Sequence, residues 1–224
     1  MADAIALEGL ERRFGDRPAL RGVSVRVGEG QTLAVFGANG AGKTTLLRVL
    51  ATLLRPHGGS VSVLGASLPG EAWKVRGRVG FVGHEPLLYP DLTARENLLF
   101  HARLHRVDSA RADRLLREVG IDGRAGDPVR ELSRGMVQRL AAARAVLHDP
   151  AVLLLDEPRA GLDPAAAEHL EPLIGRASGR TRVLVTHDVD RGLREADVVL
   201  GLRAGAVELS GSNAAAADVR RLYS

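Results

Sequence analysis

A glycine-rich run between an apolar strand and an apolar-faced helix constrains this chain most. Residues 37–44 read Gly-Ala-Asn-Gly-Ala-Gly-Lys-Thr. They follow the mostly apolar run Thr32 to Phe36, which is typical of a strand buried on both faces. Leucines then recur at helical spacing from Lys43 to Leu54. Glycine lets the backbone wrap closely around a bound group, so several N–H groups can point at one anion. The run therefore predicts an α/β fold that binds an anion at a helix N-terminus.

The same run matches the P-loop pattern G-x-x-x-x-G-K-S/T without a gap. In that pattern, Lys43 reaches the β- and γ-phosphates of a nucleotide, and the Thr44 hydroxyl binds Mg²⁺. The other residues expected to hold the phosphates are Asn39, Gly40, Ala41, Gly42 and Thr45. A glycine-rich turn that binds nothing is the alternative, and the position between a strand and a helix disfavours it.

A second apolar run ends in two carboxylates. Val152 to Leu155 predicts a buried strand, and Asp156 and Glu157 follow it directly. A parallel strand brings its C-terminal residues to the ligand crevice of an α/β sheet. We expect Asp156 to hold Mg²⁺ and Glu157 to polarise the attacking water. Without the P-loop, turn or cap residues would be an equally good interpretation.

Composition is that of a globular protein with 224 residues, 45% of them hydrophobic and 26% charged. This length favours one sizeable domain. No apolar run approaches the roughly 18 residues of a membrane span, and the N-terminus does not resemble a secretory signal. Cysteine is absent, which excludes disulfides and thiolate metal sites and fits a cytoplasmic location.

The balance of charge argues against a nucleic-acid partner. The formal net charge is +4, but the arginines are spread along the chain and form no dense run. Aromatic residues make up only 3%, so stacking on bases is poorly provided for. We therefore expect no nucleic acid among the partners. Only two lysines occur, and one of them, Lys43, stands where phosphate chemistry needs it.

The order of expected elements places a helical segment inside an α/β chain. Residues 4–8, 23–27, 60–64 and 79–82 predict strands, and residues 93–105, 109–119 and 133–147 predict helices. The first of these helices begins at a capping box, Thr93 with Glu96. After the strand at 151–155, helices are expected at 164–174 and 190–196 around a strand at 183–185. A hairpin at 197–209 and a short exposed helix follow.

One further motif precedes the helix at 133–147. It reads Leu132-Ser133-Arg134-Gly135-Met136, and taken alone Ser133 is a helix N-cap. Together with the P-loop and the acidic strand, it resembles the signature LSGGQ of the ABC transporter ATPase family. That resemblance implies that Ser133 and Gly135 contact the γ-phosphate bound to the opposite subunit. Arg134 and Met136 depart from the family pattern.

The resemblance extends over nearly the whole chain. Gly161-Leu162-Asp163 is similar to the D-loop, which implies that Asp163 lies near the partner subunit. Val185-Thr186-His187-Asp188 resembles the switch region, which implies that His187 senses the γ-phosphate. Phe14 falls where the family stacks an aromatic ring on adenine, and a plain core phenylalanine is the alternative.

His84 is the most informative departure from the family. It stands in Gly83-His84-Glu85-Pro86, where most relatives have glutamine. The resemblance places this residue near Mg²⁺ and the attacking water, and a neutral imidazole can ligate a metal or accept a hydrogen bond. A solvated loop histidine is the alternative. The nearby apolar residues 87–89 suit contact with a membrane subunit, unless they only pack locally.

The resemblance implies a complete arrangement. The fold is an α/β P-loop NTPase (RecA-like) core with an antiparallel β subdomain and an inserted helical subdomain. One ATPase domain spans residues 1–224, with the core in 1–84 and 149–224 and the helical part in 85–148. The implied ligands are ATP and Mg²⁺, with Glu157, His187 and His84 at the reacting water. The implied partners are a second copy, which forms an ATP-bound homodimer, and transmembrane permease subunits on the inner face of the cell membrane.

The cargo is indicated only by one loop. Gly-His-x-Pro followed by Leu-Thr-x-x-Glu-Asn-Leu is similar to the ATPase of the cytochrome c maturation haem exporter (CcmA-like), and the short length also fits that branch. The chief alternative is a soluble ABC ATPase of an assembly system, of the iron–sulphur scaffold type. A DNA-repair ATPase would need a long coiled-coil insertion, and a translation-linked ABC protein would need two tandem copies. The signature and switch region disfavour a small-molecule P-loop kinase.

Overall fold

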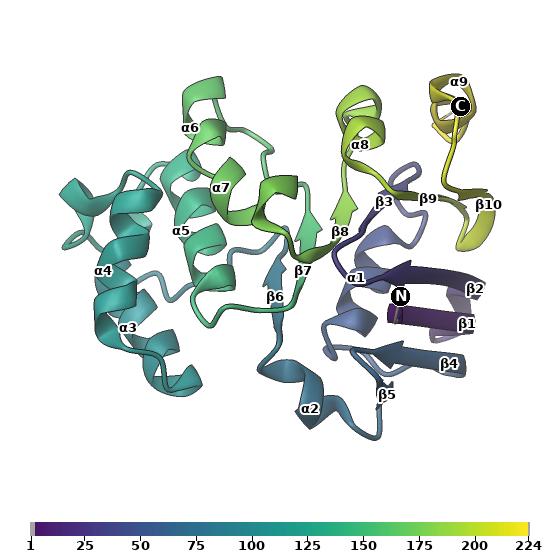
Figure 1. Ribbon diagram of the computed structural model, residues 1–224, viewed down its shortest axis with the longest axis horizontal. Helices are drawn as coiled ribbons and strands as arrows, with labels where there is room; N and C mark the ends of the chain where they lie inside the picture. Colours follow the sequence, from purple (N-terminus) through teal and green to yellow (C-terminus); the bar gives the residue numbers. More distant parts are fainter. Residues whose placement is uncertain (1–2, 224) are drawn as a thin grey trace.

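The computed structural model describes residues 3–223, which form two sheets and a group of helices (Figure 1). The larger sheet has six strands in the order β10-β9-β3-β8-β7-β6, and all neighbours are parallel except β10 and β9. Its strands are β3 (Thr32–Phe36), β6 (Val79–Val82), β7 (Val152–Asp156), β8 (Thr181–Val185), β9 (Val198–Arg203) and β10 (Ala206–Gly211). The expected hairpin near the C-terminus is therefore present.

The smaller sheet is antiparallel, in the order β2-β1-β4-β5. It contains β1 (Asp3–Phe14), β2 (Arg17–Gly28), β4 (Gly58–Val63) and β5 (Ala66–Leu68). The first two strands are much longer than the predicted segments 4–8 and 23–27. They extend because β1 and β2 pair as one hairpin up to Phe14 and Arg17, and Gly15 makes the turn with φ +55°. Strand β5 and the short helix α2 (Ala72–Arg76) were not predicted.

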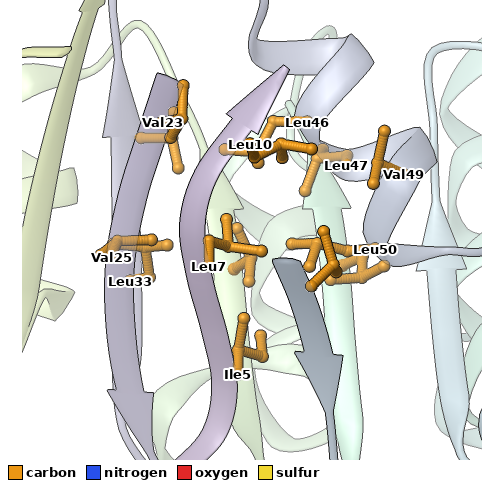
Figure 2. Close-up of a cluster of buried hydrophobic side chains, with 14 of the residues drawn as sticks. Ile5, Leu7, Leu10, Val23, Val25, Leu33, Leu46, Leu47, Val49 and Leu50 are labelled. Carbon is orange, nitrogen blue, oxygen red and sulfur yellow. The ribbon is translucent and has the colours of Figure 1, made fainter. Parts of the chain in front are cut away.

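Helix α1 (Lys43–Leu50) lies between the two sheets and forms the main core with them. Figure 2 shows Leu46 and Leu47 of this helix beside Leu10 of β1, and Leu50 in the same cluster as Leu7 of β1. All five side chains are at most 1% exposed. The helix ends at Leu50 rather than at the predicted Leu54, because Thr52 takes the left-handed conformation with φ +61°.

A second core joins the helices of residues 94–146 to the far end of the larger sheet. These helices are α3 (Ala94–His105), α4 (Ser109–Glu118) and α5 (Arg134–Val146), with 3-10 turns at 122–124 and 129–131. Leu98, Leu116 and Leu140 are fully buried there with Leu153 of β7. The predicted capping box of Thr93 and Glu96 starts α3. All three helices are within a residue or two of the predicted bounds.

The helix predicted over residues 164–174 is two short helices, α6 (Pro164–Glu168) and α7 (Glu171–Ile174). Pro172 explains the break, because its ring clashes with the carbonyl four residues earlier and it has no N–H to donate. A 3-10 turn at 176–178 leads into β8, and α8 (Val189–Glu195) follows that strand. The last helix, α9 (Ala216–Arg221), is less exposed than expected, because Val219 packs against Phe36.

This topology brings four loops to one edge of the larger sheet. Strands β3, β6, β7 and β8 are parallel, so the segments that follow them all leave at the same edge. Those segments carry the glycine-rich loop, His84, Asp156 with Glu157, and His187. Within residues 3–223, no helix combines the length and apolar character needed to cross a bilayer.

Candidate functional site

The glycine-rich loop requires two of its glycines for packing as well as for conformation. Gly37 has φ +144°, and a Cβ atom there would lie 2.2 Å from the carbonyl oxygen of Leu202. Gly42, the N-cap of α1, has φ +104°, and its Cβ would lie 2.5 Å from the carbonyl oxygen of Ala19. Gly40 also has a positive φ, but nothing lies within 4 Å of its Cβ position. The loop is thus fixed from behind by β2 and β9 and is open around Gly40.

Lys43 is buried and spans the inside of this loop. Its Nζ donates hydrogen bonds to the carbonyl oxygens of Gly37 at 2.6 Å and Ala38 at 3.0 Å. Burial lowers the pKa of Lys43, and the charges of Asp156 and Glu157 oppose that shift. The first N–H groups of α1 have no partner within the helix. An ammonium and several free N–H groups therefore meet in one place, which suits a phosphate chain.

Three other predicted loop residues complete this cradle. Asn39 is exposed at its tip, Ala41 is buried beneath it, and Thr45 is partly buried in the first turn of α1. The Ala41 carbonyl accepts a hydrogen bond from the Gly205 N–H at 3.1 Å, which ties the loop to the β9–β10 turn. The structure therefore places all the predicted P-loop residues in one short segment.

Thr44 and Asp156 meet although they are far apart in the sequence. The Thr44 hydroxyl donates a 2.8 Å hydrogen bond to Oδ2 of Asp156, which is buried at the end of β7. A hydroxyl and a carboxylate are hard oxygen ligands of the kind that Mg²⁺ prefers, and Mg²⁺ usually completes its shell with waters and phosphates. Across residues 3–223, no group of three or more His, Cys, Asp or Glu side chains could hold a metal unaided. The pair thus fits an ion that arrives with a nucleotide.

Glu157 is held in a strained and partly dehydrated position. Its φ is +49°, and its N–H donates to the Val185 carbonyl at 3.0 Å. Its Oε1 is buried without a hydrogen-bond partner, although Nε2 of His187 lies 3.5 Å away. Burial, reinforced by the charge of Asp156, raises the pKa of Glu157 to about 7. A carboxylate tuned close to neutral pH is suited to accept a proton or a hydrogen bond from water.

His187 follows β8 and faces the same place. Burial, together with the charge of Lys43, lowers its pKa, so the ring is neutral at neutral pH. Its ring centre lies 5.8 Å from that of Tyr223, whose hydroxyl donates to the Thr186 carbonyl at 3.4 Å. Tyr223 was not singled out in the sequence, because it lies 37 residues from Thr186 and belongs to no local motif.

His84 lies in the loop after β6 and is exposed. It lines a cavity of about 260 Å³ together with Asp156, Glu157 and Gln138. It also lines a second cavity of about 250 Å³ that contains Thr44. The structure thus brings His84 to the edge where the other site residues gather.

Phe14 stands at the end of β1 and is 49% exposed. The Arg12 guanidinium lies 4.9 Å from the centre of its ring. The alternative of a core phenylalanine is therefore wrong, and a ring face supported by a cation is what the structure shows.

Ser133, Gly135 and Asp163 form a separate group. Ser133 caps α5 by accepting a hydrogen bond from the Met136 N–H at 3.3 Å, and Asp163 caps α6 through the Ala166 N–H at 2.8 Å. A Cβ atom on Gly135 would lie 3.4 Å from the Leu162 side chain, so the two motifs pack together. Neither Ser133 nor Gly135 lines the cavity that contains Asp156 and Glu157.

The loop between β6 and α3 is fixed by one buried side chain. Asn97 is fully buried and exchanges hydrogen bonds with both the N–H (2.8 Å) and the carbonyl (3.0 Å) of Tyr89. It also donates to the carbonyls of Leu92 and Thr93. The Tyr89 and Leu87 side chains stay 49% and 43% exposed, whereas Leu88 packs against the helical core. Local packing therefore explains Leu88 and part of Tyr89, whose ring lies 5.1 Å from that of Phe100 on α3.

The sequence model of the ABC transporter family matches residues 20–160 of this chain. This range includes the P-loop, the signature motif and both carboxylates. The chain belongs to this family. One relative is a daunorubicin resistance ATP-binding protein from Streptomyces coeruleorubidus, which is 43% identical over 203 residues, or 88% of this chain. Another is a Nod factor export ATP-binding protein from Ralstonia nicotianae, 40% identical over 86% of this chain. The chain spans only 63% and 62% of the length of these two relatives.

Solved structures agree with the fold. The ATP-binding subunit of an ABC transporter superposes with a TM-score of 0.85 at 29% identity, over 93% of this chain and 90% of the other. A dimeric ATP-binding cassette in a post-hydrolysis state, with ADP and Pi bound, gives a TM-score of 0.83 at 28% identity, over 94% of this chain and 99% of the other. The predicted P-loop NTPase core, with its β and helical subdomains, is therefore confirmed as the fold class. The resemblance to the haem exporter branch has no counterpart among these matches.

Proposed function

We propose that this chain is the ATP-binding and ATP-hydrolysing subunit of an ABC exporter. One observation carries the proposal. The Thr44 hydroxyl bonds to Asp156 at 2.8 Å, beside Glu157 and at the end of the loop that holds Lys43. This is the set of groups that a nucleoside triphosphate and its Mg²⁺ require. Residues 1–224 would act as one ATPase domain, with 85–148 as its helical part and 1–84 and 149–224 as its core.

Phosphoryl transfer needs positioning and charge neutralisation more than covalent chemistry. Lys43 and the N–H groups of the loop and α1 would neutralise the β- and γ-phosphates. Mg²⁺, held by Thr44 and Asp156, would supply further positive charge there. Glu157 would accept a hydrogen bond from the attacking water, with its carboxylate aligned by the strained backbone. His187 would contact the γ-phosphate.

Two further residues would complete the nucleotide site. His84 would take the place of the family's glutamine beside the attacking water and Mg²⁺, and its position in the cavity with Asp156 and Glu157 supports this role. Phe14 would stack on the adenine ring, which its 49% exposure permits.

Two copies would share the bound nucleotides. Ser133 and Gly135 do not line the cavity that contains this chain's own carboxylates, although Arg134 between them does. Ser133 and Gly135 would contribute to the partner's nucleotide instead. Asp163 caps α6, and its neighbour Leu162 lies 3.4 Å from the Cβ position of Gly135. ATP would join two chains head to tail about a two-fold axis, and loss of the γ-phosphate would let them part. A dimeric cassette with ADP and Pi among the similar structures supports this arrangement.

The membrane partner would be a permease at the inner face of the cell membrane. The exposed Leu87 and Tyr89 near His84 offer an apolar contact surface of the kind that such a partner covers. Export is favoured because the Streptomyces relative is named for drug resistance and the Ralstonia relative for Nod factor export. Haem export rests on the resemblance of residues 83–98 to the cytochrome c maturation exporter, and the relatives' names do not add to it.

The ATPase assignment is tested by two substitutions. Glu157→Gln should bind ATP, turn over at a small fraction of the wild-type rate, and form an ATP-dependent dimer in size-exclusion chromatography with light scattering. Lys43→Ala should lose ATP binding in calorimetry, because it removes the only ammonium in the loop. Hydrolysis by Glu157→Gln at the wild-type rate would overturn the catalytic assignment, and unchanged binding by Lys43→Ala would overturn the P-loop assignment.

The transport assignment is tested by purification of the tagged Glu157→Gln chain from solubilised membranes with ATP. A multi-span protein should co-purify and be identified by mass spectrometry. Haem-handling companions would support haem export, whereas a different permease would leave the ATPase mechanism and remove the haem hypothesis. Purely soluble partners would favour an assembly-system ATPase instead.

A further inference from the structure

A buried ionic network lies directly behind the catalytic edge. Its centre is Arg182, the second residue of β8, with only 1% of its side chain exposed. Its Nη1 bonds to Oε2 of Glu195 on α8 at 2.8 Å, and its Nη2 donates to the Thr32 hydroxyl at 2.9 Å. A charge buried this deeply requires a partner, because an unpaired one would cost several kcal/mol, on the order of 3–5. Arg182 therefore fixes Glu195, and with it the end of α8.

Arg159 joins the same network from the other side. It stands two residues after Glu157, and its side chain is 15% exposed. One nitrogen of its guanidinium pairs with Glu171 on α7, and the other lies 3.4 Å from Oε1 of Glu195. Arg191 bonds to that same oxygen of Glu195 at 3.0 Å. Two carboxylates thus tie the loop after β7 to both α7 and α8.

A cavity of about 400 Å³ explains why these pairs matter. It is lined by Glu157, Arg159, Leu162, Arg182, Arg191 and Glu195, among others. Where a cavity adjoins a loop, close packing cannot hold that loop in place. Apart from the Arg159 pairs and the contacts of the Glu157 carboxylate with His187, segment 157–159 is joined to described residues outside its own loop by the Glu157 N–H to Val185 and by Gln138 Nε2 to the Pro158 carbonyl at 3.1 Å.

We propose that Arg159 is a positioning residue for ATP hydrolysis, which fixes the Glu157 loop to α8, the helix that follows His187. This inference rests on the proposed function. Through its ion pairs with Glu171 and Glu195, Arg159 fixes the position of residues 157–163 relative to the switch region. The loop can then present the carboxylate and the D-loop together. Arg159 itself does not contact the nucleotide and acts only through the backbone of Glu157.

The test compares Arg159→Ala with Arg159→Lys and with a matched control. The control is Arg180→Ala, because Arg180, directly before β8, also makes a contact with α7 and is 20% exposed. It bonds to Asp149 at 2.6 Å and to the Leu173 carbonyl at 3.2 Å, but at the opposite edge of the sheet. The measurements on each full chain are kcat and KM for ATP hydrolysis and the melting temperature.

If the Glu157 carboxylate loses its alignment, the effect should appear in kcat rather than in KM. Arg159→Ala should lower kcat by about tenfold or more with KM within about threefold, because ATP binding does not use this loop whereas the aligned carboxylate does. Arg159→Lys should recover a large part of kcat, because it keeps the charge but loses the planar fork. Arg180→Ala should lower the melting temperature by a similar amount with kcat within about twofold of wild type.

Several outcomes would overturn the inference. If Arg159→Ala lowers only the melting temperature, or if Arg180→Ala lowers kcat equally, Arg159 has a purely structural role. If Arg159→Ala does not fold, Glu171→Gln tests the same link from the other side, and an unchanged kcat would count against it. Failure of the proposed function is distinguishable, because the wild-type chain and Arg180→Ala would then hydrolyse no ATP.

Discussion

Acid is expected to loosen the helices of residues 94–146 through a cluster of histidines. His101 and His105 of α3 and His148 after α5 lie together, and the rings of His105 and His148 stack with centres 4.1 Å apart. His148 Nε2 lies 3.1 Å from the Val79 carbonyl, and its Nδ1 is buried without a partner. The charged neighbour is Arg144, whose own pKa burial lowers to about 10. Arg144 and the neighbouring histidines act on the cluster as cations and lower the pKa of its rings. The carboxylate of Asp149 also interacts with His148, and this interaction lowers the pKa of Asp149.

The direction of the effect follows from the pKa values. Burial, with Arg144 and the neighbouring histidines, lowers the pKa of His101 and His148 from 6.5 to about 4. The folded chain thus binds these protons less readily than the unfolded chain. Stability is complete above about pH 6.5 and is lost as the pH falls toward about 4. At about pH 5 the linkage relation gives ~2 kcal/mol per histidine, and we halve it because both rings are partly exposed and interact. The expected loss is about 2 kcal/mol in total.

Glu157 opposes this loss in the wild-type chain. Its pKa is raised to about 7 from 4.5, so its protonation stabilises the folded state as the pH falls from about 7 to about 4.5. The measurement therefore belongs in the Glu157→Gln background. Urea unfolding at about pH 7.5 and about pH 5 should show a loss larger by about 2 kcal/mol in Glu157→Gln than in the same chain with His101→Phe and His148→Gln added. Equal losses in the two chains would refute the reasoning.

Substitutions at three further positions test other parts of the fold. Gly42→Ala should abolish ATP binding in calorimetry, because its Cβ would lie 2.5 Å from the Ala19 carbonyl; normal binding would show that the loop adapts. Leu98→Ala should reduce the free energy of unfolding by about 3 kcal/mol, as measured in urea, because this side chain of α3 is fully buried in the helical core. A change below about 1 kcal/mol would mean that the core collapses around it. His84→Gln should keep ATP hydrolysis measurable in a phosphate-release assay while His84→Ala reduces it, and equal rates for the two would make His84 a bystander.

Elements with a strong local pattern could be predicted from the sequence. Three such elements are the glycine-rich loop, the apolar runs of β3 and β7, and the capping box of Thr93. Each is complete within a few residues, so its conformation is determined by residues that are close together in the sequence. The break at Pro172 was missed although its chemistry is local, because the apolar spacing on either side suggested one helix. The full lengths of β1 and β2 depend on their pairing, and β5 is only three residues long.

The candidate site divides in the same way. Its motif residues were found because each follows the end of a strand. Since those strands are parallel, the residues that follow them meet at one edge of the sheet. The Arg159 network was not found, because Arg159 and Glu195 are 36 residues apart and no periodicity connects them. One signal was visible: Arg182 directly precedes the apolar run Val183–Val185, and a charge drawn into the buried strand requires a buried partner. Which partner it takes is decided only when α8 packs against the sheet.

Asn97 gives the loop after β6 a mechanical property. Because one amide clamps Tyr89, Leu92 and Thr93 to the first turns of α3, the loop and the helix form a single stiff arm. Pressure on the exposed Tyr89 would not be absorbed by bending of the loop. It would rotate α3 as a rigid body, and this motion would be transmitted to α5, which packs against α3 and carries the signature motif in its first residues. The hydrogen bonds of Asn97 thus decide whether a force applied at Tyr89 displaces α3 and α5 or only deforms the loop.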